Sequence, residues 1–230
     1  MDAQDFDGFL DAISEAPLQV IDSAILINDY VSIDLSSSNA SLKQIDVSSS
    51  KAWELYLEHY LKERNSKAAF GGYLEKRDIY SRSTYFKQST SENERNIHLG
   101  VDVWCSVNTQ VLAVLDGEIH SLQNNTNFGD YGPTIILKHN INTTEFYSLY
   151  GHLNLESIAT AKVGDKVKQG MTIGHLGDSA INGDYAPHLH FQLIKDMEGK
   201  FGDYPGVSSD KNLEFYKHNC PDPNLLLKLR

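Results

Sequence analysis

Cysteine is scarce in this sequence, because only Cys105 and Cys220 occur among 230 residues. Two cysteines so far apart provide no disulfide framework, and the sequence leaves open whether they pair. Cys105 lies three residues after Asp102, and in an extended strand two side chains at that spacing point to opposite faces. We therefore expect a buried thiol at Cys105 and not a ligand that acts together with Asp102.

Long apolar runs and a secretory signal are also missing. No apolar stretch is long enough to cross a bilayer, so we expect no membrane span. The first residues, from Met1 to Asp7, are acidic, whereas an export signal begins basic and continues apolar. Taken literally, the chain has no export signal and is expected in the cytoplasm, although removal of a signal would allow a periplasmic or extracellular location.

Positive charge is limited as well. The chain has 20 basic and 31 acidic residues, and its formal net charge is -11. The basic residues form no cluster that would neutralise a phosphate backbone, so nucleic acid is not an expected partner. A negatively charged cell wall would not attract this chain electrostatically either.

The sequence does contain enough apolar residues for a substantial core, at 40% of its length. Apolar residues at helical spacing predict helices over residues 5–16 and 50–64. From residue 97 onward, short β-prone runs alternate with Gly, Asn and Asp. They predict strands at 101–107, 109–115, 118–123, 134–138, 145–150 and 188–195. This spacing is typical of a mainly β, antiparallel core.

The most informative motif is His188-Leu189-His190. Alternate residues of a strand point to the same face, so both imidazoles face one site while Leu189 points into a core. Three further candidates accompany this pair, namely His98, Asp102 and His152. Imidazole and carboxylate groups together favour zinc, and a catalytic zinc ion usually takes three protein ligands and a water molecule. The two surplus groups could accept a proton from that water or stabilise an oxyanion.

Each motif has a plainer explanation when it stands alone. A His-x-His pair on a strand is usually a surface feature, and His-x-x-x-Asp occurs by chance in many chains. The other five histidines fit structural roles, and of these only His139 and His175 remain candidates for the rim of a site. Tyr80 and Tyr85 are candidate donors to an oxyanion, although most tyrosines in such positions only pack.

In their order along the chain, the motifs resemble those of a known family. The segments His98-x-x-x-Asp102, Tyr150-Gly151-His152-Leu153 and Pro187-His188-Leu189-His190-Phe191 are similar to the three motifs of the M23 metallopeptidases, the lysostaphin and LytM type of zinc endopeptidase. The resemblance covers about residues 92–196. All five key positions carry the expected residue types, unlike the metal-free relatives of this family.

The resemblance implies one zinc ion per chain, bound by His98, Asp102 and His190. It implies that His152 and His188 stay off the metal, as general base and as electrostatic support for the transition state. The implied fold is the family's antiparallel two-sheet architecture, a lysostaphin-like duplicated hybrid motif, with zinc on the floor of a cleft.

The same resemblance divides the chain into three parts. Residues 1–90 would form an N-terminal helical and irregular extension, residues 91–200 the M23-like metallopeptidase domain, and residues 201–230 a C-terminal tail packed on the core. Loops 124–132 and 178–185 are expected to wall the cleft, and Gln192 stands where many members have Glu. Whether the acidic N-terminal segment covers the cleft stays open.

The expected activity is hydrolysis of an amide bond in a peptide, with a peptidoglycan stem or cross-bridge as the expected substrate. Two alternatives stay open. One is a cytoplasmic zinc amidase or peptidase acting on a small metabolite, and the other is a non-catalytic module that uses the groove to bind peptide and regulate a partner. The flanks, including Gly202-Asp203-Tyr204-Pro205, also resemble an M23 unit fused to class III aminotransferases in multidomain proteins. The sequence does not decide the oligomeric state.

Overall fold

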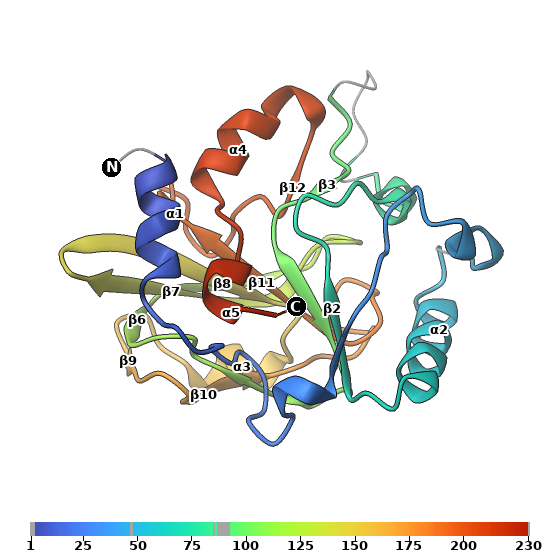
Figure 1. Cartoon of the computed structure of the whole chain (residues 1–230), viewed down its shortest axis with the longest axis horizontal. Coiled ribbons are helices and arrows are strands. Elements are labelled where there is room, and N and C mark those ends of the chain that lie inside the picture. The colour runs from blue at the N-terminus through green and yellow to red at the C-terminus, as the bar shows by residue number, and fades with distance from the viewer. Residues whose placement is uncertain (1–2, 47, 85, 87–92, 230) are drawn as a thin grey trace.

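The computed structural model describes residues 3–46, 48–84, 86 and 93–229 (Figure 1). Its helices are α1 (Ala3–Asp11), α2 (Ser50–Glu63), α3 (Leu155–Thr160), α4 (Leu213–Asn219) and α5 (Asn224–Leu227), with 3-10 helices η1 (Ile27–Asp29), η2 (Ala40–Gln44), η3 (Asp78–Arg82) and η5 (Asp210–Asn212). Its strands are β1 (Tyr30–Ser32), β2 (Ala68–Gly71), β3 (Ile97–His98), β4 (Val101–Trp104), β5 (Gln110–Leu112), β6 (Gly117–Asn125), β7 (Gly132–Ile141), β8 (Thr144–Gly151), β9 (Lys166–Val167), β10 (Thr172–His175), β11 (His188–Ile194) and β12 (Val207–Ser208).

Within the described residues, one sheet of eight strands dominates, in the order β1-β2-β4-β11-β8-β7-β6-β9. Its neighbours pair antiparallel, except for the parallel pair β1–β2. Two small antiparallel sheets, β10–β5 and β12–β3, complete the β structure of this part of the chain. The predicted mainly β, antiparallel fold class is confirmed, and each strand predicted between 101 and 195 is present within a few residues of its predicted bounds.

The N-terminal segment belongs to the main sheet. Residues 1–90 supply the two predicted helices, α1 and α2, and they also supply β1 and β2, which extend the sheet beyond β4. The sequence did not predict β2, because this stretch is short and almost wholly buried and lacks the alternation of a half-buried strand. The division of the chain at residue 90 stays a prediction.

α1 and α5 lie side by side over the sheet (Figure 1). Phe6 of α1 packs edge-on against Phe146 of β8, with ring centroids 6.1 Å apart. The helix ends at Asp11, earlier than predicted. The reason is that the chain turns there toward Leu18, whose amide donates to the Leu226 carbonyl of α5 at 3.1 Å. This contact ties the N-terminal helix to the C-terminal segment.

α2 lies at the opposite end of the molecule from β9 (Figure 1). Its N-cap is Ser49, whose hydroxyl accepts a hydrogen bond from the Ala52 amide at 3.2 Å. Trp53 and Leu57 are buried and pack in one cluster with Trp104 of β4. The helix therefore turns its apolar face toward β4.

β11 runs through the interior of the fold, between β4 and β8. Leu189, Phe191 and Leu193 enter the largest apolar cluster, whereas His188 and His190 line a cavity on the other face. This alternation is what an extended strand requires. One strand therefore separates the core from the candidate site.

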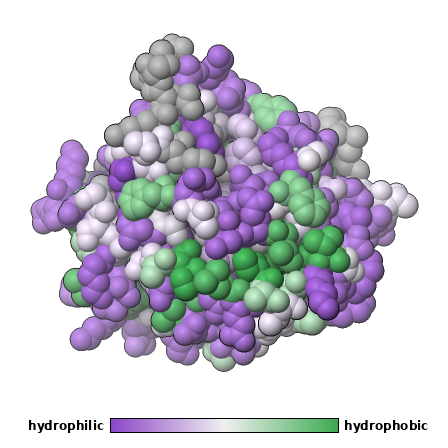
Figure 2. Space-filling view, turned by 180° about the vertical axis from the view of Figure 1, so that it is seen from behind, coloured by the Kyte–Doolittle hydropathy of each residue, from purple (hydrophilic) through white to green (hydrophobic). Residues whose placement is uncertain are grey.

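The reverse side of the molecule is largely hydrophilic, with a band of hydrophobic residues across its lower half (Figure 2). Exposed apolar side chains of the described chain include Leu155, Val163 and Met171. None of the described helices combines the length and apolar character that a membrane crossing requires.

Candidate metal centre

Neighbouring strands bring the candidate side chains together. In the register of β11, His190 lies opposite Asp102 on β4 and opposite Gly151 on β8. His152 follows Gly151 directly, and His98 reaches the group from β3. Strands that are adjacent in space but distant in sequence therefore collect the predicted positions.

The three predicted ligands form a buried cluster. His98 Nε2 lies 2.8 Å from His190 Nδ1, and each of these nitrogen atoms lies 3.2 Å from Asp102 Oδ1. All three residues are at most 2% exposed. Among the residues that the structure describes, their ligand atoms are close enough to bind one metal ion.

The hydrogen bonds of the two imidazoles leave lone pairs at the centre of this cluster. His98 Nδ1 donates to the Gly72 carbonyl at 2.9 Å, and His190 Nε2 donates to Gln192 Oε1 at 2.9 Å. The Gln192 amide is oriented by its own NH₂ group, which donates to the Pro205 carbonyl at 3.1 Å. His98 Nε2 and His190 Nδ1 are therefore both acceptors, and they face each other beside a carboxylate oxygen.

This donor set fits a zinc ion. Three electron-rich atoms this close repel one another unless a cation or a proton lies between them. In a tetrahedral zinc site with bonds of about 2.0–2.1 Å, ligand atoms lie about 3.3 Å apart, close to the 2.8 to 3.2 Å between these atoms. Gly100 permits the close packing, since a Cβ there would come within 2.8 Å of His190 Cε1.

Asp102 also contacts a buried cation. Arg77 Nη1 donates to Asp102 Oδ2 at 2.5 Å, and Arg77 Nε donates to Glu75 Oε2 at 2.5 Å. Burial alone would raise the pKa of Asp102, but His98 and Arg77 hold that pKa well below its usual range. Oδ1 is thus left for the ligand cluster. The sequence did not point to Arg77, because no local pattern distinguishes it from a solvated arginine.

His152 and His188 lie next to the ligands. Their Nδ1 atoms donate to the carbonyls of Asn182 at 2.7 Å and Ala186 at 2.8 Å, which leaves each Nε2 as an acceptor. Burial lowers the pKa of both histidines, so both are neutral at neutral pH. His152 has a φ of 64°, a conformation that is rare for non-glycine residues and that is enriched at functional sites.

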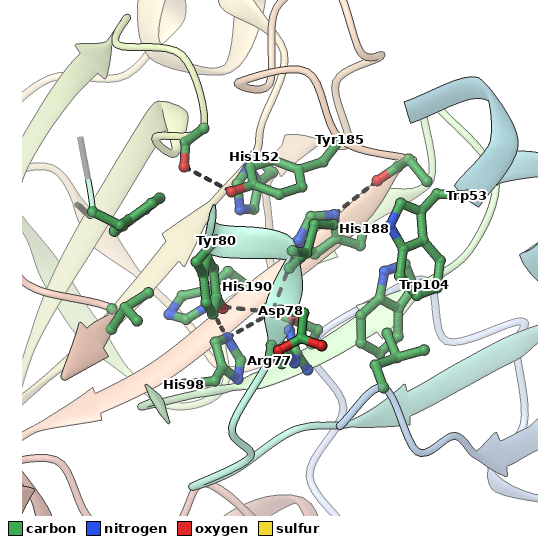
Figure 3. A pocket seen from close by; sticks show the side chains of 18 of the residues that line it. Trp53, Arg77, Asp78, Tyr80, His98, Trp104, His152, Tyr185, His188 and His190 are labelled. Atoms are coloured by element: carbon green, nitrogen blue, oxygen red, sulfur yellow. Dashed lines mark hydrogen bonds and ion pairs between the residues drawn. The ribbon is translucent and has the colours of Figure 1, made fainter. Parts of the chain in front are cut away.

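A cavity of about 400 Å³ lies beside these histidines. Figure 3 shows His152, His188 and His190 grouped together, with Trp53 and Trp104 on one side of them. Both loops that were predicted to wall the cleft contribute to the lining, through Asp130 and Tyr131 of one and Tyr185 of the other. The sequence did not single out Tyr131, whose ring centroid lies 5.0 Å from that of His190.

The remaining candidates have different positions. Tyr80 lines the cavity, and burial raises its pKa, so its hydroxyl stays protonated. Tyr85 lies outside the described residues. His139 and His175 do not line the cavity, and the structure does not bring them to the site. Cys105 is a buried thiol away from the ligand cluster, as expected.

Comparison with known proteins assigns a family to the central part of the chain. Residues 96–201 match the model of peptidase family M23. This matching part of the chain is called the M23 domain below. Over 97 residues the chain is 40% identical to the glycyl-glycine endopeptidase ALE-1 of Staphylococcus capitis, covering 42% of this chain and 24% of that protein. Over 98 residues it is 32% identical to the peptidoglycan DD-endopeptidase ShyC of Vibrio cholerae, covering 42% and 20%. The match therefore spans about a quarter or less of either relative.

Solved structures of such enzymes are also similar. The catalytic domain of lysostaphin from Staphylococcus simulans is 25% identical, with a TM-score of 0.39, covering 67% of this chain and 94% of that one. A zinc-containing peptidase from Vibrio cholerae is 23% identical, with a TM-score of 0.36, covering 47% and 30%. The M23 domain begins at residue 96, so Arg77 lies outside it. The resemblance of the flanks to a unit fused to aminotransferases stays a prediction.

Proposed function

We propose that this chain is a zinc-dependent metallopeptidase that hydrolyses an amide bond in a peptide, with a peptidoglycan stem or cross-bridge as the substrate to test first. The proposal depends above all on the buried cluster of His98, Asp102 and His190, in which lone pairs converge while the imidazole N–H groups bond outward. The relatives named as a glycyl-glycine endopeptidase and a peptidoglycan DD-endopeptidase support a substrate of this class.

In this proposal His98, Asp102 and His190 hold the zinc ion. A bound zinc ion would polarise the scissile carbonyl and lower the pKa of a water molecule, to about 7 in well-studied zinc enzymes. His152 accepts a proton from the attacking water at Nε2, because its Nδ1–H is held by the Asn182 carbonyl. It then returns this proton to the leaving amine.

Two further groups assist the reaction, His188 as a hydrogen-bond acceptor at Nε2 and Tyr80 as a donor to the developing negative charge. His188 lies next to His152, with ring centroids 4.1 Å apart, and its ring stacks on Trp104. The hydroxyl of Tyr80 keeps its proton and can donate it in a hydrogen bond to the oxyanion of the tetrahedral intermediate. His152, His188 and Tyr80 therefore act as neutral groups beside the ion pair of Asp102 with Arg77.

Mass spectrometry of fragments released from purified cross-linked muropeptides tests this function. The zinc-loaded protein should release fragments whose masses identify the bond. His152→Ala should keep its zinc and lose on the order of 10²–10⁴-fold in rate, because the base is missing. His175→Ala is the matched control, since this histidine does not line the cavity, and it should behave as the wild type.

The ligand assignment has its own test. His190→Ala should lose zinc during dialysis, whereas His152→Ala should retain it, as measured by metal analysis of the folded proteins. Full zinc occupancy without His190 would refute the assignment.

A second candidate function is hydrolysis of an amide in a small metabolite, which one observation favours. The cavity beside the histidines has a wall built by the N-terminal segment, including Leu42 and Trp53. Zinc-loaded protein that releases nothing from muropeptides would shift the assignment to this candidate. Tight muropeptide binding without any hydrolysis would support a non-catalytic peptide-binding module instead.

A further inference from the structure

One side of the cavity is apolar. This side, called here the apolar wall, consists of Leu35, Leu42, Trp53, Leu57, Ile79 and Trp104. Five of these six residues precede residue 96 and so lie outside the M23 domain. The segment that adds β1, β2 and α2 to the fold therefore also adds a surface to the site.

The apolar wall lies next to the candidate catalytic groups. Trp104 is directly opposite His188 in the pairing of β4 with β11, and the two rings stack with centroids 5.6 Å apart and planes 18° apart. Figure 3 shows Trp53 and Trp104 on the same side of His188. Because consecutive Cα atoms in a peptide are about 3.8 Å apart, the residue adjacent to a bond cleaved at the histidines can place its side chain against this wall.

The apolar wall also contains an unused hydrogen-bond donor. Trp53 is 5% exposed, and its Nε1 atom is buried without a hydrogen-bond partner. A buried N–H group without an acceptor costs free energy, and such groups are rare in native structures. An acceptor on a bound molecule would satisfy it, which makes the wall suited to an apolar group that carries a carbonyl.

We propose that the apolar wall is a specificity subsite that binds a large aromatic or aliphatic side chain next to the scissile amide, while Trp53 Nε1 donates to a carbonyl of the same substrate. This proposal rests on the proposed peptidase function and names its substrate class. Because the cavity is continuous with the candidate catalytic histidines, its occupant is the substrate. A glycyl-glycine bond would leave the wall uncovered.

The test uses peptides of the form acetyl-Gly-Gly-X-Gly-Gly-amide, where X is Gly, Leu or Phe. For the zinc-loaded protein, kcat/KM at the bonds flanking X should be on the order of 10- to 100-fold higher for Phe or Leu than for Gly, the benefit of burying one large apolar side chain. Ile45→Trp adds a large ring at a partly buried lining position, and should bring kcat/KM for the Phe and Leu peptides down to that for the Gly peptide. Leu55→Trp, at an exposed position on α2 that does not line the cavity, is the matched control and should keep the preference.

Trp53→Phe removes the N–H group and keeps an aromatic ring. It should lower kcat/KM for the Phe peptide by roughly 3- to 10-fold, the loss of one hydrogen bond. Cleavage with equal kcat/KM for all three peptides would overturn the subsite and leave the peptidase function intact.

A binding experiment tests the subsite independently of the peptidase function. Binding of N-acetylphenylalaninamide and of N-acetylglycinamide is monitored through the change in tryptophan fluorescence. If the protein prefers the Phe compound and Ile45→Trp abolishes this preference, the subsite is supported. If no peptide is cleaved at the same time, the peptidase function alone is overturned. Absence of both cleavage and preferential binding overturns both proposals.

Discussion

His98 and Asp102 are each oriented by a group that precedes the M23 domain. His98 donates to the Gly72 carbonyl, and Asp102 accepts from Arg77. Gly72 has a φ of 107°, and a Cβ there would clash with the Arg77 guanidinium, so this position requires glycine. Hydrogen bonds of this kind fix the orientation of metal ligands and tune their basicity. Part of the candidate metal centre thus depends on residues outside the family motifs.

Arg77 is predicted to strengthen zinc binding by positioning Asp102. In Arg77→Met the side chain keeps its length and loses both ion pairs, so zinc affinity measured by titration calorimetry should fall roughly 10- to 100-fold. Lys76→Met is the matched control, because the Lys76 ammonium forms an exposed ion pair with Asp210. Because Arg77→Met also leaves Glu75 unpaired, Arg77→Met combined with Glu75→Gln should show the same loss. Unchanged affinity in both Arg77 variants would contradict the positioning role.

Gln192 is predicted to support the metal through His190. Gln192→Leu removes the acceptor of the His190 Nε2–H group, so zinc should be lost at roughly 10- to 100-fold lower chelator concentration than from the wild type. Gln192→Glu keeps an acceptor at this position and should retain zinc at least as well. The pair is informative because a purely structural role would make both variants equally weak.

The sequence could point to the candidate site residues because each of their motifs is local, whereas the groups that support these residues come from distant parts of the chain. His188 and His190 are two residues apart, and the alternation of a strand is enough to put them on one face. Arg77 meets Asp102 only because β2 pairs with β4 and turns back over it. A contact between residues so far apart in sequence has no signature in either local segment.

At the scale of elements, β7 and β8 are joined by buried polar side chains as well as by their ladder. His139 Nδ1 donates to the Asp116 carbonyl at 2.9 Å, and His139 Nε2 lies 2.7 Å from Ser148 Oγ. Burial lowers the pKa of His139 to about 4. The histidine is fully buried and does not line the cavity, so its neutral form serves the fold.

This histidine should make the fold sensitive to acid. Its pKa is about 4 in the folded chain and 6.5 as the reference value, so the unfolded chain takes up the proton first as the pH falls. The stability from neutral His139 is present above about pH 6.5, and roughly 3 kcal/mol of unfolding free energy is lost as the pH falls to about 4. In urea titrations of zinc-free protein, His139→Gln should lose less unfolding free energy than the wild type over this pH range, by that amount. His175→Gln should lose as much as the wild type. Parallel pH dependences of wild type and His139→Gln would exclude this role.

Six strands between residues 101 and 194, namely β4, β5, β6, β7, β8 and β11, were predicted because short β-prone runs are separated there by turn residues. The two-residue strands β3 and β9 and the short β10 were not predicted. β1 and β2 were not predicted, because β1 is only three residues long and β2 is almost wholly buried. Their place at the edge of the sheet depends on a parallel pairing between distant segments, Tyr30 with Ala68 and Ser32 with Phe70. Local sequence carries little information on such a pairing.

At the scale of the whole molecule, the candidate site joins parts of the chain that are distant in sequence. The predicted ligands come from β3, β4 and β11, and Arg77 and the apolar wall come from the N-terminal segment. Tyr73, also from that segment, donates to the Cys220 carbonyl at 2.8 Å and so ties it to the C-terminal tail. An M23 domain cut at residue 96 would therefore lose one wall of its cavity and the partner of Asp102.

Zinc should consequently stabilise the entire chain. The unfolded chain cannot assemble ligands from β3, β4 and β11, so zinc is expected to bind only the folded state. It should then add about 4 kcal/mol to the unfolding free energy when its free concentration is about 1,000 times Kd. For a chain of this size that corresponds to a rise in Tm on the order of 10 °C. Thermal melts followed by circular dichroism should show this difference between zinc-loaded and chelator-treated wild type. His190→Ala should melt at one temperature under both conditions, because a ligand is missing. If the zinc-loaded wild type is shown to contain zinc and the chelator-treated wild type melts at the same temperature, the ion does not contribute to the stability of this fold.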